Sequence, residues 1–227
     1  MMASGKLLLA SKAAWASVLL LVISTLGASH RGAGAYTSTF TGESPRWEEI
    51  SGYLSDGDLV FRTGRDIISR LVLSQGDSSQ FSHVGIILKQ ESGLVVVHAL
   101  PRDGKSPGGV LIEPLRVFAA SDNASDIGFY RVKGISPDAR NSIREFVLRQ
   151  QGKPFDDDFL MSEDGKMYCT ELALKAFEAA GIRVAKSMPH IQVMLIKEPV
   201  EPPDYLRRLP QMEAIVPNPA VHTDASR

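Results

Sequence analysis

The order of the predicted elements indicates an α+β fold with a mostly antiparallel central sheet. Helical and strand patterns follow one another as helix, strand, helix, several strands, helix, and then a helix that carries a cysteine. Two apolar strand patterns, at 81–88 and 95–98, are separated by a short turn at 90–93, which is typical of antiparallel neighbours. The 227 residues are enough for one domain with a sizeable core.

Apolar spacing and turn residues place the individual elements along the chain. We expect helices over 47–54, 66–73, 114–118 and 137–151, and strands over 59–61, 81–88, 95–98, 110–112 and 127–132. The clearest of these is the helix over 137–151, because Pro137 suits a first turn and Gly152 ends the pattern. Beyond the cysteine helix we expect a strand over 193–196 and a short helix within 199–210.

The N-terminal segment has the layout of a secretory signal peptide. Lys6 and Lys12 precede an apolar run over 13–26, and the small residues 33–35 fit a cleavage site before Tyr36. The apolar run is short for a membrane span, although an uncleaved anchor is the alternative. We therefore expect export to the periplasm or the outside of the cell, and membrane contact only where the segment is retained. The expected divisions are a signal peptide (1–35), a lead-in (36–54), one domain (55–210) and a flexible tail (211–227).

The composition narrows the classes of partner. The formal net charge is -1 and no long run of one sign occurs, so we expect no nucleic-acid partner. The acidic run 156–158 lacks the alternating oxygen ligands and the glutamate of a calcium loop, and we interpret it as a solvated loop. No metal and no cofactor are assigned.

Cys169 is the single cysteine of the chain, so it has no partner for an internal disulfide. It stands at the front of the helical pattern that ends at Gly181. The unpaired N–H groups of a first helical turn favour a thiolate, which predicts a lowered pKa for this thiol. The alternative is a buried cysteine that packs as a small apolar residue.

Two histidines provide candidate partners for this thiol. His83 opens the strand pattern 81–88 and His98 ends the pattern 95–98, so the hairpin brings both imidazoles to one edge of the sheet. A helix that packs against this edge would complete a Cys–His–His site. Taken alone, His83 fits an ordinary hydrogen-bonded position better than a catalytic one, and His98 fits an ordinary strand end as well as an orienting role.

Four short motifs occur in a fixed order: GDLVF at 57–61, FSHVGI at 81–86, GKPFD at 152–156 and YCTEL at 168–172. Together they resemble the permuted papain-like amidases of the YaeF/YiiX type, relatives of the NlpC-type cell-wall hydrolases, over roughly residues 55–181. The resemblance implies a permuted papain-like fold whose sheet packs against the cysteine helix. The histidine precedes the cysteine here, as a circular permutation requires, and geometry rather than chain order defines such a site.

The resemblance implies specific roles for these residues. Cys169 becomes the nucleophile and His83 the base, with a third polar residue on the strand that follows. YiiX-like members are expected to carry a glutamate there, whereas this chain has His98, as in the Cys–His–His form of the NlpC relatives. Glu113 is the alternative orienting residue. Glu171, two residues beyond the cysteine, is interpreted as a structural charge at the helix start.

Three functions are consistent with this arrangement. The first is a secreted cysteine hydrolase that cleaves an amide bond through a thioester, with cell-wall peptides as the substrate class that the resemblance implies. The second is an acyltransferase or lipid acyl hydrolase that uses the same Cys–His pair, as in the related lecithin–retinol acyltransferase-like enzymes. The third is a binding domain that keeps the fold without catalysis.

Overall fold

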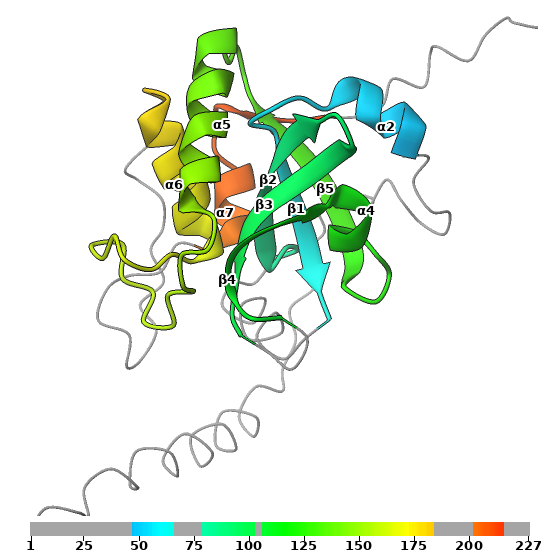
Figure 1. The fold of residues 1–227 in the computed structure, drawn as a ribbon. Coiled ribbons are helices and arrows are strands. Elements are labelled where there is room, and N and C mark those ends of the chain that lie inside the picture. The colour runs from blue at the N-terminus through cyan, green and yellow to red at the C-terminus, as the bar shows by residue number, and fades with distance from the viewer. Residues whose placement is uncertain (1–46, 66–78, 103–105, 184–201, 216–227) are drawn as a thin grey trace, which may run out of the picture. The chain divides into compact units, whose positions relative to one another are not determined.

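An antiparallel sheet runs through the middle of the protein (Figure 1). The structure is a computed structural model that describes residues 47–65, 79–102, 106–183 and 202–215, all within the unit 39–227. Over these residues six strands pair in the order β4-β3-β2-β1-β5-β6. Their bounds are β1 Leu59–Gly64, β2 His83–Gln90, β3 Gly93–Leu100, β4 Gly109–Pro114, β5 Ala124–Val132 and β6 Met212–Ala214. The predicted α+β class and antiparallel sheet are confirmed.

Five helices are found in the same part of the chain: α2 Trp47–Tyr53, α4 Leu115–Phe118, α5 Pro137–Gln150, α6 Cys169–Ala179 and α7 Pro203–Arg207. Each of them was predicted within a few residues. The expected helix over 66–73 and the expected strand over 193–196 lie outside the described residues. Strand β6 was not predicted; it lies at the start of the segment expected to be a flexible tail. None of the described helices combines the length and apolar character that crossing a membrane requires.

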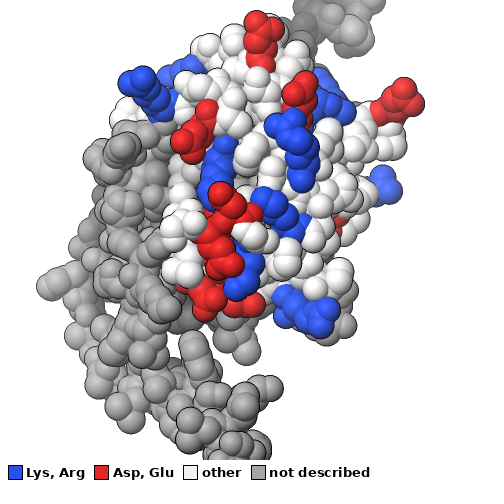
Figure 2. All heavy atoms as spheres, turned by 60° about the vertical axis from the view of Figure 1, so that its left-hand side comes forward, with Lys and Arg blue, Asp and Glu red and all other residues white. Residues whose placement is uncertain are grey.

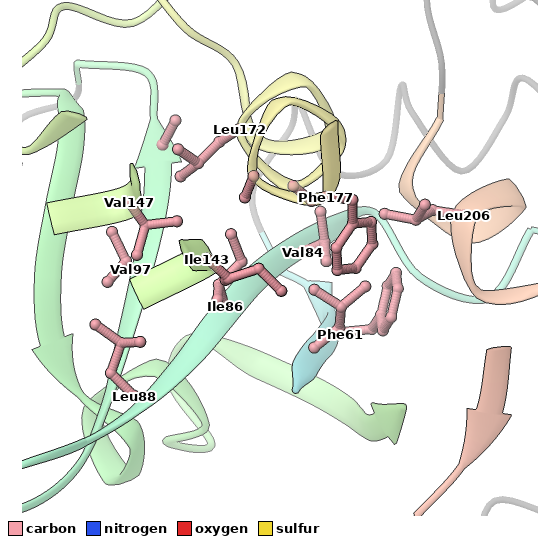
Figure 3. Close-up of a cluster of buried hydrophobic side chains, with 14 of the residues drawn as sticks. Phe61, Val84, Ile86, Leu88, Val97, Ile143, Val147, Leu172, Phe177 and Leu206 are labelled. Carbon is pink, nitrogen blue, oxygen red and sulfur yellow. The ribbon is translucent and has the colours of Figure 1, made fainter. Parts of the chain in front are cut away.

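One face of the sheet packs against α5 and α6 and forms the larger core (Figures 1 and 3). Side chains point to alternate faces along a strand, so Val84, Ile86 and Leu88 of β2 all point toward these helices. From α6, Leu172 and Phe177 meet them with no solvent exposure. This face therefore holds the cysteine helix against the sheet.

The opposite face carries a smaller apolar cluster under α2 and α4 (Figure 1). Ile87 of β2 and Val96 of β3 point to this side, where they pack with Leu115 and Phe118 of α4. His83 is four residues from Ile87 on β2, and His98 is two residues from Val96 on β3. Because side chains alternate between faces, both imidazoles lie on this second face as well.

The GKPFD motif docks on the edge strand β4. The Val110 N–H donates to the Lys153 carbonyl over 2.8 Å, and the Gly152 N–H donates to the Val110 carbonyl over 2.9 Å. Gly109 has a positive φ of 90°, and a Cβ there would lie 2.3 Å from the Lys153 oxygen. Glycine is therefore required at this position.

Helix α7 fixes the start of β2. The buried Asp204 carboxylate accepts the backbone N–H groups of Gln80 and Phe81, each over 3.1 Å. The same carboxylate pairs with Arg207 and with Arg208. A segment more than a hundred residues away in sequence thus holds the chain just before His83.

Candidate active site

His83 and His98 form a bonded pair in the interior of the protein. The Nε2 atom of His83 lies 2.9 Å from the Nδ1 atom of His98, and the exposed fractions of the two residues are 7% and 0%. The pair exists because β2 and β3 form the predicted hairpin. In β2, a Cβ on Gly85 would lie 2.3 Å from Val96 and 3.2 Å from the His98 Cβ, so a larger residue would collide with β3 beside the pair. The predicted proximity of the two imidazoles is confirmed.

Glu113 extends this pair at its far end. In the register of β3 and β4, Glu113 lies opposite Val96 and is therefore on the same face as His98. Its Oε1 atom lies 3.0 Å from the Nε2 atom of His98. His98 and Glu113 were alternatives for one orienting position, but the structure places both in a single chain, Glu113–His98–His83.

Phe118 and Arg62 enclose the histidine pair. The Phe118 ring stacks on His83 with centroids 5.7 Å apart and meets His98 edge-on at 5.1 Å. Arg62 is the cross-strand partner of His83, and its guanidinium lies 4.5 Å from the centre of the Phe118 ring. The Arg62 Nη1 atom also donates to the Phe118 carbonyl over 3.1 Å.

Neither Arg62 nor Phe118 was identified from the sequence. An arginine in the otherwise apolar start of strand 59–64 is the signal that could have indicated a buried charge. No comparable signal marks Phe118, which occupies an ordinary apolar helix position.

This environment keeps both imidazoles neutral near pH 7. Burial lowers the pKa of His83 well below its ordinary value of 6.5, and the charges of Arg62 and His98 lower it further. Burial also lowers the pKa of His98, although Glu113 partly opposes this effect. Burial raises the pKa of Glu113, but its bond to His98 and the Arg62 charge bring the net pKa below the ordinary value. A resting imidazolium at His83, which a thiolate–imidazolium pair requires, is therefore not what this structure holds.

Cys169 is the first residue of α6, as predicted, and the start of this helix is well anchored. The buried Glu171 carboxylate accepts the Tyr168 N–H over 3.2 Å and pairs with Lys175 over 2.9 Å. Lys175 also reaches Asp164 in the preceding loop at 2.7 Å. Acidic and basic side chains are interspersed over this side of the molecule (Figure 2). The structural interpretation of Glu171 agrees with these contacts.

The Cys169 thiol is half-buried and lies beside the start of β2. Its contacts are the Thr170 hydroxyl, at 3.9 Å from Sγ, and the backbone N–H of Val84. Burial raises the pKa of the thiol, while the Val84 N–H and the N–H groups of the first helical turn lower it. The helix start lowers the pKa of the thiol, as predicted, but burial raises it by more. The predicted net decrease of this pKa is therefore wrong.

The pairing between β2 and β3 ends before the histidines and the residue whose N–H meets the thiol. β2 pairs with β1 up to His83 and β3 pairs with β4 up to Leu100, yet the pairing between β2 and β3 stops at Ile86 and Val97. The Val84 N–H that meets the thiol belongs to this unpaired end. Cys169 packs on the α5/α6 face, whereas the strand alternation places the imidazoles on the α4 face. The pairing of Cys169 with His83 stays a prediction.

Two buried acidic side chains bind backbone N–H groups or arginines. The Asp156 carboxylate is fully buried, rather than solvated, and accepts the N–H groups of Asp158 and Leu160. Asp58, the residue just before β1, pairs with Arg131 and Arg140. Among the described residues, no group of three His, Cys, Asp or Glu side chains is placed to hold a metal ion.

Comparison with known families matches residues 53–224 to the permuted papain-like amidase enzyme, YaeF/YiiX, C92 family. The chain belongs to this family. The resemblance drawn from the four motifs is confirmed, and with it the permuted papain-like fold. A comparison with curated proteins gives no match.

A solved structure shares the fold. The crystal structure of the metalloprotein yiiX from Escherichia coli O157:H7 aligns with a TM-score of 0.59 and 21% identity, covering 72% of this chain and 97% of that one. That protein is described as a metalloprotein, but among the described residues of this chain no group of side chains is placed to hold a metal ion. The facing nitrogens of His83 and His98 are engaged with each other, and the other His98 nitrogen faces Glu113.

Proposed function

We propose that this permuted papain-like family member is an exported cysteine hydrolase that cleaves an amide bond through a thioester at Cys169. The observation that carries the proposal is the series Glu113–His98–His83, whose two histidines are buried and which ends one residue from Val84, whose backbone N–H lowers the pKa of the thiol. General-base activation of a nucleophile needs a neutral imidazole beside the thiol, and we propose that His83 takes this place. The substrate class is the amide bonds of cell-wall peptides.

The reaction follows from the protonation states of the two groups. His83 takes the thiol proton as sulfur attacks the carbonyl carbon, and the backbone N–H at the start of α6 faces the developing oxyanion. The C–N bond then breaks, and the same proton passes from His83 to the leaving amine. Water next gives a proton to His83 and attacks the thioester. The carboxylic acid leaves, and the sulfur recovers a proton from His83.

Partly exposed apolar side chains favour a second candidate function. The loop before the cysteine presents Phe155, Phe159, Leu160 and Met161 with intermediate exposure. The Phe159 ring packs 5.4 Å from that of Tyr168, the neighbour of Cys169. An apolar surface beside the thiol suits a lipid acyl chain, so the same Cys–His pair would then transfer or hydrolyse an acyl ester.

The experiment is a mass-spectrometric comparison of substrates. The mature protein is incubated separately with cell-wall stem peptides and with phospholipids, quenched in acid, and measured as intact protein and as released products. A new amine from the peptides together with an acyl adduct on Cys169 supports the amidase, whereas an adduct from phospholipid only supports the acyl-lipid function. The Cys169→Ala variant is the control and should carry no adduct.

Two results overturn the catalytic proposal. The first is the absence of product and adduct with every substrate, which leaves a binding domain. The second is a crystal structure in which the Cys169 Sγ lies more than about 6 Å from the His83 ring with no rotamer that joins them.

Export is a separate part of the proposal and rests on the N-terminal sequence alone. Residues 1–35 lie outside the described part of the structure, and we propose that they direct export and are removed before Tyr36. The intact mass of the protein recovered outside the cytoplasm should start at Tyr36. A mass that retains residues 1–35 would instead support a membrane anchor.

A further inference from the structure

We infer that Glu113 is a positioning residue that fixes the tautomers of both His98 and His83, so that the Nδ1 atom of His83 is the free proton acceptor. This inference rests on the proposed function for its catalytic meaning, but not for its structural content. It goes beyond a three-residue site because Glu113 does not contact His83 and instead acts through His98 on the Nδ1 atom of His83.

The first step concerns the proton between Glu113 and His98. An ionised carboxylate only accepts hydrogen bonds, so the His98 nitrogen facing it must carry the proton. The Glu113 side chain is 25% exposed, and its lowered pKa keeps it ionised near pH 7. Nε2 of His98 lies 3.0 Å from the carboxylate, within ion-pair distance although outside hydrogen-bond geometry, and the negative charge there favours the proton on Nε2.

The second step carries this choice to His83. His98 is fully buried, and its pKa is lowered, so its ring holds one proton only. With that proton on Nε2, the Nδ1 atom is a bare acceptor. His83 must then donate from Nε2 across the 2.9 Å contact. The single proton of the neutral His83 is thereby used, which leaves its Nδ1 atom unprotonated.

The side chains around the two imidazoles keep water from taking over the role of the Glu113 carboxylate in fixing the proton positions. Phe118 is fully buried and contacts both rings, and the Arg62 guanidinium lies 4.5 Å from the centre of the Phe118 ring. If the carboxylate were absent, the two rings would have two protonation patterns of similar energy. In the second pattern His98 donates from Nδ1, and His83 carries its proton on the nitrogen that the thiol needs.

The test reads the tautomers directly in the free protein. Nitrogen-15 NMR of the imidazoles at pH 7 distinguishes protonated from unprotonated ring nitrogens and needs no substrate. The chain has five histidines, and single His83→Gln and His98→Gln variants assign the two signals. We expect protonated Nε2 and bare Nδ1 on both residues in the wild type.

The decisive variant is Glu113→Gln, whose amide can either accept or donate. It should give a mixture of both tautomers at His98 and at His83. Glu213→Gln is the matched control, because Glu213 lies on β6, the other edge strand of the sheet, and is exposed. It should leave the wild-type spectrum unchanged.

Activity then separates this inference from the proposed function. With a working substrate, Glu113→Gln should lower kcat by about 10–100-fold while KM stays within about twofold, since the residue does not touch the substrate. A wild-type spectrum with a protonated Nδ1 at His98, or a variant with unchanged tautomers, would overturn the inference. The expected tautomers in a protein without amidase activity would overturn the proposed function instead. If Glu113→Gln does not fold, the wild-type spectrum alone decides.

Discussion

The two faces of the sheet are built from the same strands but differ in what they bury. The α5/α6 face buries the larger apolar cluster, including Phe61, Ile86 and Phe177, and the buried Glu171 lies at the start of α6. The α4 face buries a smaller apolar cluster and, beside it, Arg62, His83 and His98, with Glu113 at the margin. One face thus supplies most of the hydrophobic stabilisation, while the other holds ionisable groups out of water.

This difference explains why the pKa values of the site are shifted as they are. Burying a charge without a partner costs more than keeping the group neutral, so both histidines remain uncharged. The thiol sits at the border, where burial raises its pKa against the effect of the helix start. The following experiments address each face in turn.

The largest expected effect is on turnover and concerns Cys169, which lies at the border between the two faces. Cys169→Ser should reduce turnover by about 10⁴-fold or more, because a serine hydroxyl is far more basic than a thiol. The two side chains are almost isosteric, so the melting temperature should stay nearly the same. Turnover of the confirmed substrate and a thermal melt check both parts. Retained turnover would mean that Cys169 is not the nucleophile.

The next largest effect is a difference in kcat between variants of the two histidines on the α4 face. His83→Ala should lower kcat by about 10³-fold or more, and His98→Ala by about 10–100-fold, since the base transfers the proton and its neighbour only orients it. Both proteins should fold, with a loss of about 1–3 kcal/mol from the unpaired nitrogen that remains. Measurements of kcat test this order, and urea unfolding checks the stability of both variants. An unchanged kcat in His98→Ala would contradict the prediction.

The α5/α6 face should respond in stability. Phe177 is fully buried against β2, so Phe177→Ala should lower the free energy of unfolding by about 3–5 kcal/mol. Val117 is 40% exposed on α4, and Val117→Ala should change it by no more than about 0.5 kcal/mol. Equal losses in the two variants, measured by urea unfolding, would show that the two positions do not differ in burial.

The smallest effect is the pH dependence of stability, and it belongs to the α4 face. The folded pKa values of His83 and His98 lie below the unfolded value of 6.5, so the unfolded chain binds more protons as the pH falls. The stabilisation is complete above about pH 6.5 and is lost below it, by up to about 1.4 kcal/mol per histidine per pH unit. Urea unfolding at pH 7.5 and 5.5 measures this slope.

A variant tests the source of that slope. His98→Gln removes one titrating ring, so its stability should fall less than that of the wild type between these two pH values. An unchanged slope would assign the pH dependence to other groups. Glu113, whose folded pKa is also lowered, contributes only at more acidic pH, because its stabilisation is lost as the pH falls through the range of carboxyl groups.

Local patterns in the sequence were sufficient for the hairpin and for the cysteine helix. The alternating apolar residues of 81–88 and 95–98 and the short turn between them fix the pairing of β2 with β3, and this pairing brings His83 to His98. Helical spacing after Cys169 and Gly181 at its end mark α6 in the same way. Such features depend on neighbours in the chain, which a sequence displays directly.

Long-range contacts could not be predicted in this way. β6 is three residues long and forms only because β5 offers an edge, and Asp204 anchors Gln80 and Phe81 from a distant helix. Arg62 and Phe118 meet the histidines because α4 folds back over β2 and β3. No local spacing encodes these encounters.

The sequence by itself determined the family, the order of the elements, the place of Cys169 at the start of a helix and the meeting of two histidines. Each of these follows from residue type and short-range periodicity. Only the tertiary structure decided that Glu113 continues the histidine pair, that Arg62 and Phe118 enclose it, and that the thiol and the imidazoles lie on different faces beside a gap in the pairing. It also decided the direction of the thiol pKa, because burial depends on what the whole chain packs around a group.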